Sequence, residues 1–550
     1  MDYGNLPTQP LPVLPGPHPE SVRPRRTRTL ARAGGHVALA NVASKVTGFA
    51  RTLALAAAIG AAAVADSYNL ANNMPNMVYE LMLGSVFASA IVPLLIRARR
   101  LGRRGSREFT QRLLVAAVIV AAAVTVVTVL CAPLLVRILV AHPEQRRLTT
   151  IFAYLLLPQI FCYALTMLLT AVLNVRDSFA AAAWAPVVNN VIVLATLGIF
   201  VLLPGPVTLT PASMTAAQVL TLGLGTTAGI AGQAAWVAVA LRRNGFRWSW
   251  RVRPIPHTWR PVRAAVPLLG WVLAYAGISQ VGVVVTLRVA SDHGGMSVYT
   301  YADPLFQVPY GILAASLLTV LMPRISRAAA RGDRPAVIAD LGRGARYLVV
   351  AMVPVTVAMA LLGPVLATVV FTGRVDAAAA RLIGAAVASA AFGLAPFALV
   401  MLQLRVFYAD NDTRTPTLIN IAMVLTKIGV LALSVTVLPD PGVVVMLGVA
   451  GSAAYVVGAL TGHLLLRRRY GLLGFATVAT TFARVIWAAA IAGWGCLVAM
   501  ALARHAVADP TLGRVLTVSV GAAIGAATFL LAAKIIGIPE VRHARALLRG

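Results

Sequence analysis

The sequence predicts an all-α polytopic membrane protein with about fourteen transmembrane helices. Of its 550 residues, 59% are hydrophobic and only 12% are charged, whereas about 25% of the residues are charged in a typical soluble domain. The hydrophobic residues form repeated runs of about 20, each long enough to cross about 30 Å of hydrocarbon as a helix. Because a single soluble core cannot absorb so much apolar surface, we expect lipid to surround most of the chain.

The predicted elements follow in order from the N-terminus. Residues 1–35 are rich in proline and arginine and lack apolar periodicity, which predicts a disordered cytoplasmic tail. The basic segment before Leu53 to Ala65 is similar to a signal peptide, but Lys45 and Arg51 interrupt the apolar region and many further spans follow. The predicted spans are 37–61, 70–97, 113–140, 150–174, 182–204, 215–241, 264–289, 299–322, 346–371, 380–407, 417–438, 442–466, 483–503 and 514–536.

The loops between the spans differ in charge on the two sides of the membrane. The loops near 62–69, 205–214, 291–298 and 439–441 contain no Lys or Arg. This asymmetry satisfies the positive-inside rule with both termini cytoplasmic and predicts a multi-pass protein of the plasma (inner) membrane. The exceptions on the outer side are Arg146, Arg147 and Arg504, which are too few to reverse the orientation. The basic inner segments are 97–104, 242–263, 324–346, 467–469 and the cytoplasmic tail 537–550.

A faint internal repeat divides the chain. The segment VPLLIRAR at 92–99 is similar to MPRISRAA at 322–329, and APVVNNVIVL at 185–194 is similar to TPTLINIAMVL at 415–425. The members of each pair are six spans apart, an even number, so the two halves share one orientation as a parallel pseudo-repeat. The alternative is that proline and basic residues recur at helix ends without a repeat. The predicted division is an N-lobe at 36–241, a basic cytoplasmic loop at 242–263, a C-lobe at 264–466 and two C-terminal helices within 467–536.

The first span carries a polar stripe. Its members share one side of a helix and are Asn41, Ser44, Lys45, Gly48, Arg51 and Thr52. A central cation costs about 2.5–3.5 kcal/mol in a membrane helix, so we expect Lys45 and Arg51 to face water or an anion. The alternative is that they reach an interface or pair with Glu80 in the second span. Lys45, Arg51, Asn41 and Ser44 are therefore candidate substrate-binding residues.

Further charged residues lie in or beside the spans. Arg288 is near the outer end of the seventh span, the counterpart of the first, so it faces either the same central cleft or the membrane interface. Asp66, Glu80 and Asp303 are candidates for charge pairing or for gating by ion pairs that break and form. Arg405 and Lys427 lie deep in spans 10 and 11, where they either line the cavity or extend toward the cytoplasm.

Several classes of function are not supported by any motif. The net charge of +30 is spread in clusters between apolar runs, and motifs that read nucleic acid are missing. Cys131, Cys162 and Cys496 lie within apolar runs without CxxC spacing, so no metal site is indicated. There is no Walker loop, HExxH or GxSxG motif. We therefore predict no catalytic residues, no metal, no cofactor and no nucleic-acid partner, and a transporter rather than an enzyme.

The segment SKVTGFAR at 44–51, followed by Ala65-Asp66 and by Met74-Pro75-Asn76 through Val92-Pro93, resembles the start of the MurJ (MviN) family of lipid II flippases. YTYAD at 299–303 with Pro309-Tyr310-Gly311, and FYADNDTRTP at 407–416, are similar to that family's second half. The resemblance covers roughly residues 36–536. It implies the fold of the multidrug/oligosaccharidyl-lipid/polysaccharide exporters, with two six-helix lobes around a central cavity and two extra helices.

The resemblance also implies roles for individual residues. Cations at the positions of Lys45 and Arg51 face the cavity in that family, where they would hold a pyrophosphate. Two family arginines are replaced here by Tyr79 and by Pro304, and Arg288 would supply missing charge. The arginine-rich, lysine-poor composition suggests an actinobacterial member. Related chains there can carry an additional cytoplasmic domain after the last spans, whereas this sequence stops at Gly550.

The leading hypothesis is a flippase for lipid II, the undecaprenyl-pyrophosphate-linked peptidoglycan precursor, which rocks its lobes by alternating access. Its partners would be this anionic lipid-linked substrate, membrane lipids and cell-wall synthesis proteins. One rival is an exporter of drugs or of another polyprenyl-linked saccharide, and drug efflux would predict an acidic cavity. A second rival is a non-transporting scaffold that recruits cell-wall enzymes, for which Lys45 and Arg51 would be dispensable. No energy source can be identified from the sequence.

Overall fold

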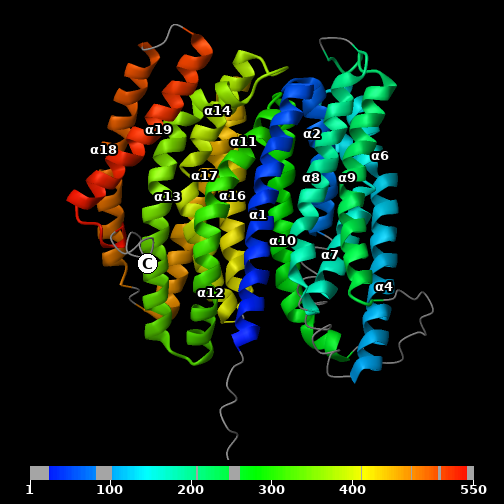
Figure 1. The fold of residues 1–550 in the computed structure, drawn as a ribbon, viewed down its shortest axis with the longest axis horizontal. Coiled ribbons are helices and arrows are strands. Elements are labelled where there is room, and N and C mark those ends of the chain that lie inside the picture. The colour runs from blue at the N-terminus through cyan, green and yellow to red at the C-terminus, as the bar shows by residue number, and fades with distance from the viewer. Residues whose placement is uncertain are drawn as a thin grey trace, which may run out of the picture.

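The computed structural model describes residues 24–81, 102–176, 178–205, 209–246, 260–410, 412–471, 474–505 and 509–541. Within these ranges the chain is a helical bundle without strands (Figure 1). The helices are α1 (Pro24–Ile59), α2 (Ala63–Tyr79), α4 (Gly102–Leu130), α5 (Ala132–Leu139), α6 (Pro143–Leu156), α7 (Gln159–Val175), α8 (Phe179–Leu202), α9 (Ala216–Arg243), α10 (Arg260–Asp292), α11 (Met296–Pro309), the π-helix η4 (Tyr310–Ala314), α12 (Ala315–Ala330), α13 (Arg334–Val370), α14 (Ala377–Ala391), α15 (Leu394–Ala409), α16 (Arg414–Val437), α17 (Asp440–Tyr470), α18 (Phe475–His505) and α19 (Pro510–Ile535).

The fold class is confirmed. Twelve helices of the described chain are long and apolar enough to cross a membrane, or thirteen if α14 and α15 form one bent span. The predicted span 70–97 begins in α2, and its remainder after residue 81 lies outside the described residues. With this span added, the predicted number of about fourteen is consistent with the structure.

Several helices begin earlier than the apolar runs. α1 begins at Pro24, within the segment 1–35 that was predicted to be a disordered tail, and α10 begins at Arg260, within the predicted loop 242–263. α13 begins at Arg334, where the side chain of Asp333 accepts a hydrogen bond from the Ala336 amide and caps the helix. Hydropathy marks only the part of a helix that lies in lipid. Because Arg, Ala and Leu are all good helix formers, the helices continue beyond it.

Several spans of the described chain are interrupted. α6 and α7 are separated at Pro158, and α14 and α15 meet at an angle of 46° around Gly393. The span α11–α12 contains the π-helix η4 directly after Pro309, a residue that cannot donate a backbone hydrogen bond. Such breaks are tolerated in membranes where neighbouring helices satisfy the freed backbone groups.

The internal repeat has a structural counterpart. Asn190 of α8 donates hydrogen bonds to the Ser44 carbonyl at 3.2 Å and to the Thr47 hydroxyl at 3.0 Å, both on α1. The matching Asn420 of α16 donates to the Tyr275 carbonyl at 3.0 Å and to the Ser279 hydroxyl at 2.9 Å, both on α10. The fifth helix of each lobe is thus joined to the first helix by an asparagine at the same position of the repeat.

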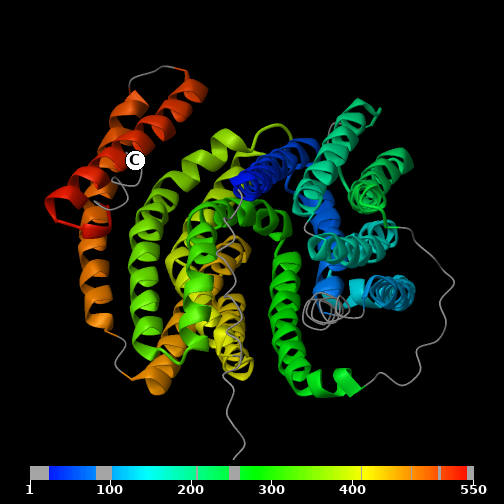
Figure 2. The same ribbon diagram turned by 60° about the horizontal axis from the view of Figure 1, so that its bottom comes forward.

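The two lobes lie side by side (Figures 1 and 2). Helices α1, α2 and α4–α9 form one lobe and α10–α17 form the other, with α1 packed on α8 and α10 packed on α16. α18 and α19 pair with each other at the periphery and pack against α13. The predicted positive-inside orientation places the start of α1 and the α12–α13 turn at the cytoplasmic face, and the starts of α2, α11 and α14 at the outer face.

Candidate functional site

The polar stripe lies on α1, which is continuous from Pro24 to Ile59. The two hydrogen bonds from Asn190 hold the middle of α1 against α8. Gly48 leaves room for this contact, because the position that a Cβ would occupy on it lies 3.5 Å from the Asn190 amide nitrogen. Ser44, a predicted binding residue, contributes its carbonyl to this contact, while Asn41 is exposed. The contact with α8 thus fixes the position of the helix that carries Lys45 and Arg51.

Lys45 reaches from α1 toward the other lobe. Its side chain is exposed, and its Cε and Nζ atoms lie 3.5 and 3.7 Å from the position that a Cβ would occupy on Gly311. Gly311 belongs to η4, the π-helix that follows Pro309. A residue whose ammonium group lies against the opposite lobe is not reaching for the membrane interface. The structure therefore places the Lys45 side chain between the lobes.

Arg51 lies two turns further along α1 and is half-buried. Its guanidinium acts electrostatically on the hydroxyl groups of Tyr68 and Tyr163 in the N-lobe. Within the described chain, neither Arg51 nor Lys45 forms an ion pair with a carboxylate at salt-bridge distance. Their charge is therefore not neutralised by a direct acidic partner, and the alternative of a pair with Glu80 is not observed.

Asp303 and Lys427 meet in the C-lobe. They line one cavity of about 70 Å³ together with Tyr299, Ser452 and Tyr455. The charges of Lys427 and Lys45 both act on Asp303. Lys427 therefore points into the C-lobe rather than toward the cytoplasm, which decides between the two alternatives left by the sequence. Arg405 donates to the Leu318 carbonyl at 3.4 Å.

Asp66 joins the two lobes at the end where α2 and α11 begin. Its side chain is only 3% exposed, and it accepts a hydrogen bond of 2.7 Å from the Ser297 amide at the start of α11. Asn69 donates to the Ser297 hydroxyl at 3.1 Å, and Tyr301 donates to the Gly60 carbonyl at 2.9 Å. A carboxylate at a helix N-terminus is stabilised by the free amides and the helix dipole. The lobes are thus held together at the predicted outer face.

Arg374 adds to this closure. It lies between α13 and α14, its amide donates to the Ala57 carbonyl at 3.2 Å, and its guanidinium donates to the Ala58 carbonyl at 3.0 Å. The close approach requires glycine at Gly60, where φ is 77° and a Cβ would lie 2.8 Å from the Arg374 carbonyl oxygen.

Glu80 and Arg288 contact groups that the sequence analysis does not name. Glu80 accepts hydrogen bonds from Asn76 at 3.5 Å and from Gln280 of α10 at 3.3 Å, so it contacts amides rather than a cation. Arg288 forms an ion pair of 2.7 Å with Asp292 and donates to the Ile138 carbonyl at 2.7 Å. Arg288 therefore tethers α10 to α5 and does not join Lys45 and Arg51, because an acidic residue one turn away neutralises it.

The two departures from the family pattern have structural consequences. Tyr79 donates to the Met167 sulfur at 2.9 Å and packs on Tyr163 with ring centroids 5.7 Å apart. Pro304 follows Asp303 within α11. Aromatic rings thus stand where an arginine is expected in the N-lobe. Sequence reasoning missed Tyr163 and named Gly311 only as part of a motif, because the contacts of both residues join distant helices and follow no spacing rule.

The comparisons with known proteins agree with this architecture. The family model described as lipid II flippase MurJ matches residues 55–510. This chain belongs to the MurJ family. A probable lipid II flippase MurJ of Rhizobium meliloti (strain 1021) is 28% identical over 423 residues, which cover 74% of this chain and 76% of that protein. The lipid II flippase MurJ of Burkholderia cenocepacia is 27% identical over 441 residues, covering 77% and 80%.

Solved structures extend the MurJ likeness to the fold. A structure of lipid II flippase MurJ in an inward closed conformation superposes with a TM-score of 0.71 at 16% identity and covers 91% of this chain and 99% of its own. An inward-facing multidrug transporter of the MATE family reaches a TM-score of 0.55 at 15% identity over 80% of this chain and 95% of its own. The chain therefore has the MurJ fold, which is related to that of MATE transporters.

Proposed function

We propose that this chain moves lipid II, the undecaprenyl-pyrophosphate-linked peptidoglycan precursor, from the inner to the outer leaflet. Membership of the MurJ family supports this cargo. The observation that carries the binding mechanism is the pair of intramembrane cations, Lys45 and Arg51, neither of which forms a salt bridge in the described chain. A pyrophosphate would supply the anion that the protein does not.

The charge of these two residues suits a phosphate cargo. Arg and Lys form charge-assisted hydrogen bonds with phosphate oxygens, and such bonds are roughly twice as strong as neutral ones. A lysine donates as a flexible point charge, and an arginine can donate two parallel bonds. We assign Lys45 and Arg51 to the pyrophosphate, with the exposed Asn41 as a further donor at the cytoplasmic side of the stripe.

The contacts between the lobes support a direction of opening. Asp66, Ser297, Tyr301 and Arg374 join the lobes at the predicted outer face. We propose that the cavity receives cargo from the cytoplasmic leaflet while these contacts hold. Release outside requires them to break, so that one lobe rocks against the other.

The topology belongs to the same proposal. We place both termini in the cytoplasm and the chain in the plasma membrane, because arginines dominate the loops at one end of the bundle. The chain acts as a transporter rather than an enzyme. The segment 1–35 and the basic loops would serve as contacts for cell-wall synthesis proteins.

The experiment is complementation of a bacterium depleted of its own flippase, with externally exposed lipid II as the readout. Wild type, Lys45→Ala and Arg51→Ala are compared at matched membrane levels, with Arg147→Ala as a control cation that is exposed and outside the stripe. We expect wild type and the control to restore exposure and the stripe variants to lose most of it. Failure of wild type would refute the cargo, and full activity of both stripe variants would refute the cationic site.

A further inference from the structure

Glu80 is an acidic side chain between the two lobes, at a depth where membrane proteins rarely place an isolated charge. It directly follows Tyr79, the last residue of α2, and it contacts Gln280 of α10, so it faces the C-lobe rather than lipid. From Gln280 to the end of α10 at Asp292 the helix rises about 18 Å. Glu80 is thus near the middle of the roughly 30 Å hydrocarbon layer.

The groups that surround Glu80 are amides. Gln280 donates to one carboxylate oxygen at 3.3 Å, Asn76 donates to the other at 3.5 Å, and the Glu80 side chain is still exposed. No cation of the described chain lies at salt-bridge distance from it. A charge at this depth is costly unless an opposite charge meets it, and such residues mark the path of a substrate or an ion.

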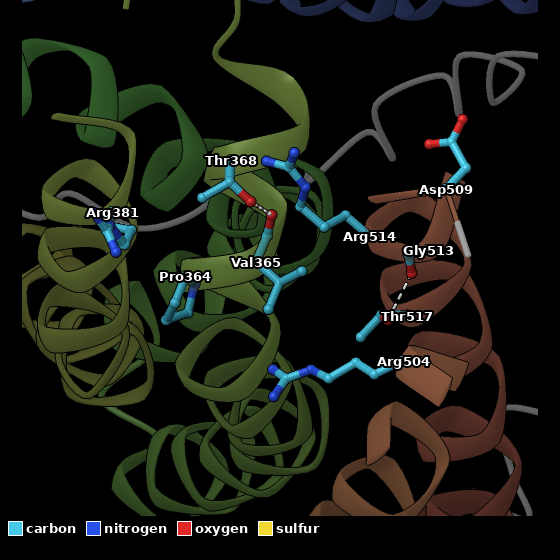
Figure 3. A pocket seen from close by; sticks show the side chains of 9 residues that line it. All are labelled: Pro364, Val365, Thr368, Arg381, Arg504, Asp509, Gly513, Arg514 and Thr517. Atoms are coloured by element: carbon cyan, nitrogen blue, oxygen red, sulfur yellow. Dashed lines mark hydrogen bonds between the residues drawn. The ribbon is translucent and has the colours of Figure 1, made fainter. Parts of the chain in front are cut away.

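Most other acidic side chains of the described chain have a partner of their own. The charges of Lys427 and Lys45 act on Asp303. Asp509 accepts hydrogen bonds from the amides at the start of α19 and lies beside a cavity that three arginines line (Figure 3). Four more acidic residues form an ion pair with an arginine, namely Asp292, Asp340, Asp412 and Glu540. Among the described residues, Glu80 is therefore a mid-membrane carboxylate whose cation the protein does not supply.

Gln280 adds a second acceptor at this place. Its side chain is only 6% exposed, and its carbonyl oxygen has no hydrogen-bond partner in the part of the chain that the structure describes. A buried carbonyl without a donor is unfavourable, whereas an ammonium group has three donors and no acceptor. The Glu80 carboxylate and the Gln280 carbonyl oxygen together match such a group. Because they belong to different lobes, a cation held by both would join α2 to α10.

We propose that Glu80, together with Gln280, binds an ammonium group of the cargo. This inference rests on the proposed function, in which Lys45 and Arg51 hold the pyrophosphate. Peptide cross-links of a cell wall are amide bonds, so a peptidoglycan precursor must carry a free amine that can form them. The cavity then recognises both charges of its cargo, and a polyprenyl phosphate without an amine lacks the second contact. Glu80 is in this way a specificity-determining residue.

The test compares two forms of a lipid II analogue that has a short, water-soluble prenyl chain with a fluorescent label. One form has the free amine of its peptide, and in the other this amine is acetylated. Binding to the purified full chain in detergent is measured by fluorescence anisotropy. We expect wild type to bind the free amine about tenfold more tightly, the effect of one hydrogen bond between charged groups. Glu80→Gln should bind both forms equally, with the affinity that wild type has for the acetylated form.

Three further variants sharpen the test. Glu144→Gln is the control, because Glu144 is an exposed acidic residue in the first turn of α6, and it should keep the preference of wild type. Gln280→Leu removes the second acceptor and should reduce the preference. Glu80→Lys should bind a succinylated analogue, whose amine has become an anion, more tightly than the free amine. A thermal unfolding midpoint for each variant shows that it is folded.

The outcomes separate this inference from the proposed function. Binding of neither form by wild type would refute the cargo itself, and the inference with it. Binding of both forms by wild type without a preference, or the same preference in wild type and Glu80→Gln, would refute the ammonium site alone. Loss of the preference when sodium chloride replaces choline chloride at equal concentration would show that the site takes a free inorganic cation instead.

Discussion

Lys45 lies so close to the backbone of residue 311 that only a very small side chain fits there. Its ammonium lies 3.7 Å from the position of a Cβ on Gly311, an ordinary van der Waals distance that leaves no space for a larger group. We predict that Gly311→Leu displaces Lys45 and abolishes most lipid II exposure in the complementation assay, whereas Gly311→Ala retains much of it. The physical cause is the loss of the cation's position rather than of its charge.

The control for this prediction is Gly429→Leu on α16. A Cβ at that glycine meets nothing within 4 Å, so the same substitution in another membrane helix has open space. Both leucine variants must reach the membrane at the level of wild type. Normal flipping by Gly311→Leu would contradict the placement of Lys45 against η4.

At the scale of helices, the two asparagines of the repeat make equivalent bonds. We predict that Asn190→Ala and Asn420→Ala each lower the free energy of unfolding by about 1 kcal/mol, because each removes two interhelical hydrogen bonds that are worth about 0.6 kcal/mol apiece on average. Asn73→Ala is the control, because its amide donates to the Asn69 carbonyl of the same helix and forms no bond to another helix in the described part of the chain. The measurement is the denaturant or thermal midpoint of the purified chain in detergent.

Only the N-lobe variant should also affect flipping, since Asn190 holds the helix that carries Lys45. Equal flipping defects in Asn190→Ala and Asn420→Ala would show that general loosening of the bundle, and not the position of α1, limits transport.

A second element-scale prediction concerns the turn between α15 and α16. Arg469, at the end of α17, pairs with Asp412 at 2.7 Å and with Asp410 at 3.2 Å. Burial acts to raise the pKa of Asp412, but hydrogen bonds from Thr415 and the charge of Arg469 outweigh it, so this pKa is lowered. A lowered pKa stabilises the fold above the unfolded-state value of about 3.9, and this stabilisation is lost as the pH falls below it.

We therefore expect Asp412→Asn to unfold at a lower temperature than wild type near neutral pH, and the difference to shrink below about pH 4. Its size should be about 1 kcal/mol at most, because Arg469 is partly exposed. The measurement is the thermal midpoint across pH for both chains. A difference that grows on acidification would contradict the sign.

At the scale of the whole molecule, the sequence predicts the bundle well and its site only in part. Runs of apolar residues locate the spans because lipid forces every backbone group into a helix. The stripe residues Lys45 and Arg51 follow from spacing along one helix. For Arg288 the sequence left two surroundings open, because its ion pair with Asp292 and its bond to the Ile138 carbonyl depend on how α10 packs against α5. Contacts between distant helices, such as Lys45 with Gly311, leave no periodic signal in one sequence.

The closure of the two lobes at the predicted outer face yields the last prediction. Asn69 and Ser297 lie on α2 and α11, one from each lobe, and their side chains are bonded at 3.1 Å. We predict that a short thiol-specific cross-link in Asn69→Cys/Ser297→Cys, made with the exposed Cys131 replaced by serine, stops the external exposure of lipid II. Exposure should return when a reducible cross-link is cleaved. Each single cysteine variant, treated in the same way, should keep its activity, because its lobes are still free to part.

The physical reason is that a cargo with a large headgroup can leave only if α2 and α11 separate. The covalent bond forbids this separation while leaving Lys45 and Arg51 intact. Undiminished flipping by the fully cross-linked chain would mean that the cargo leaves by a route that does not open between the lobes.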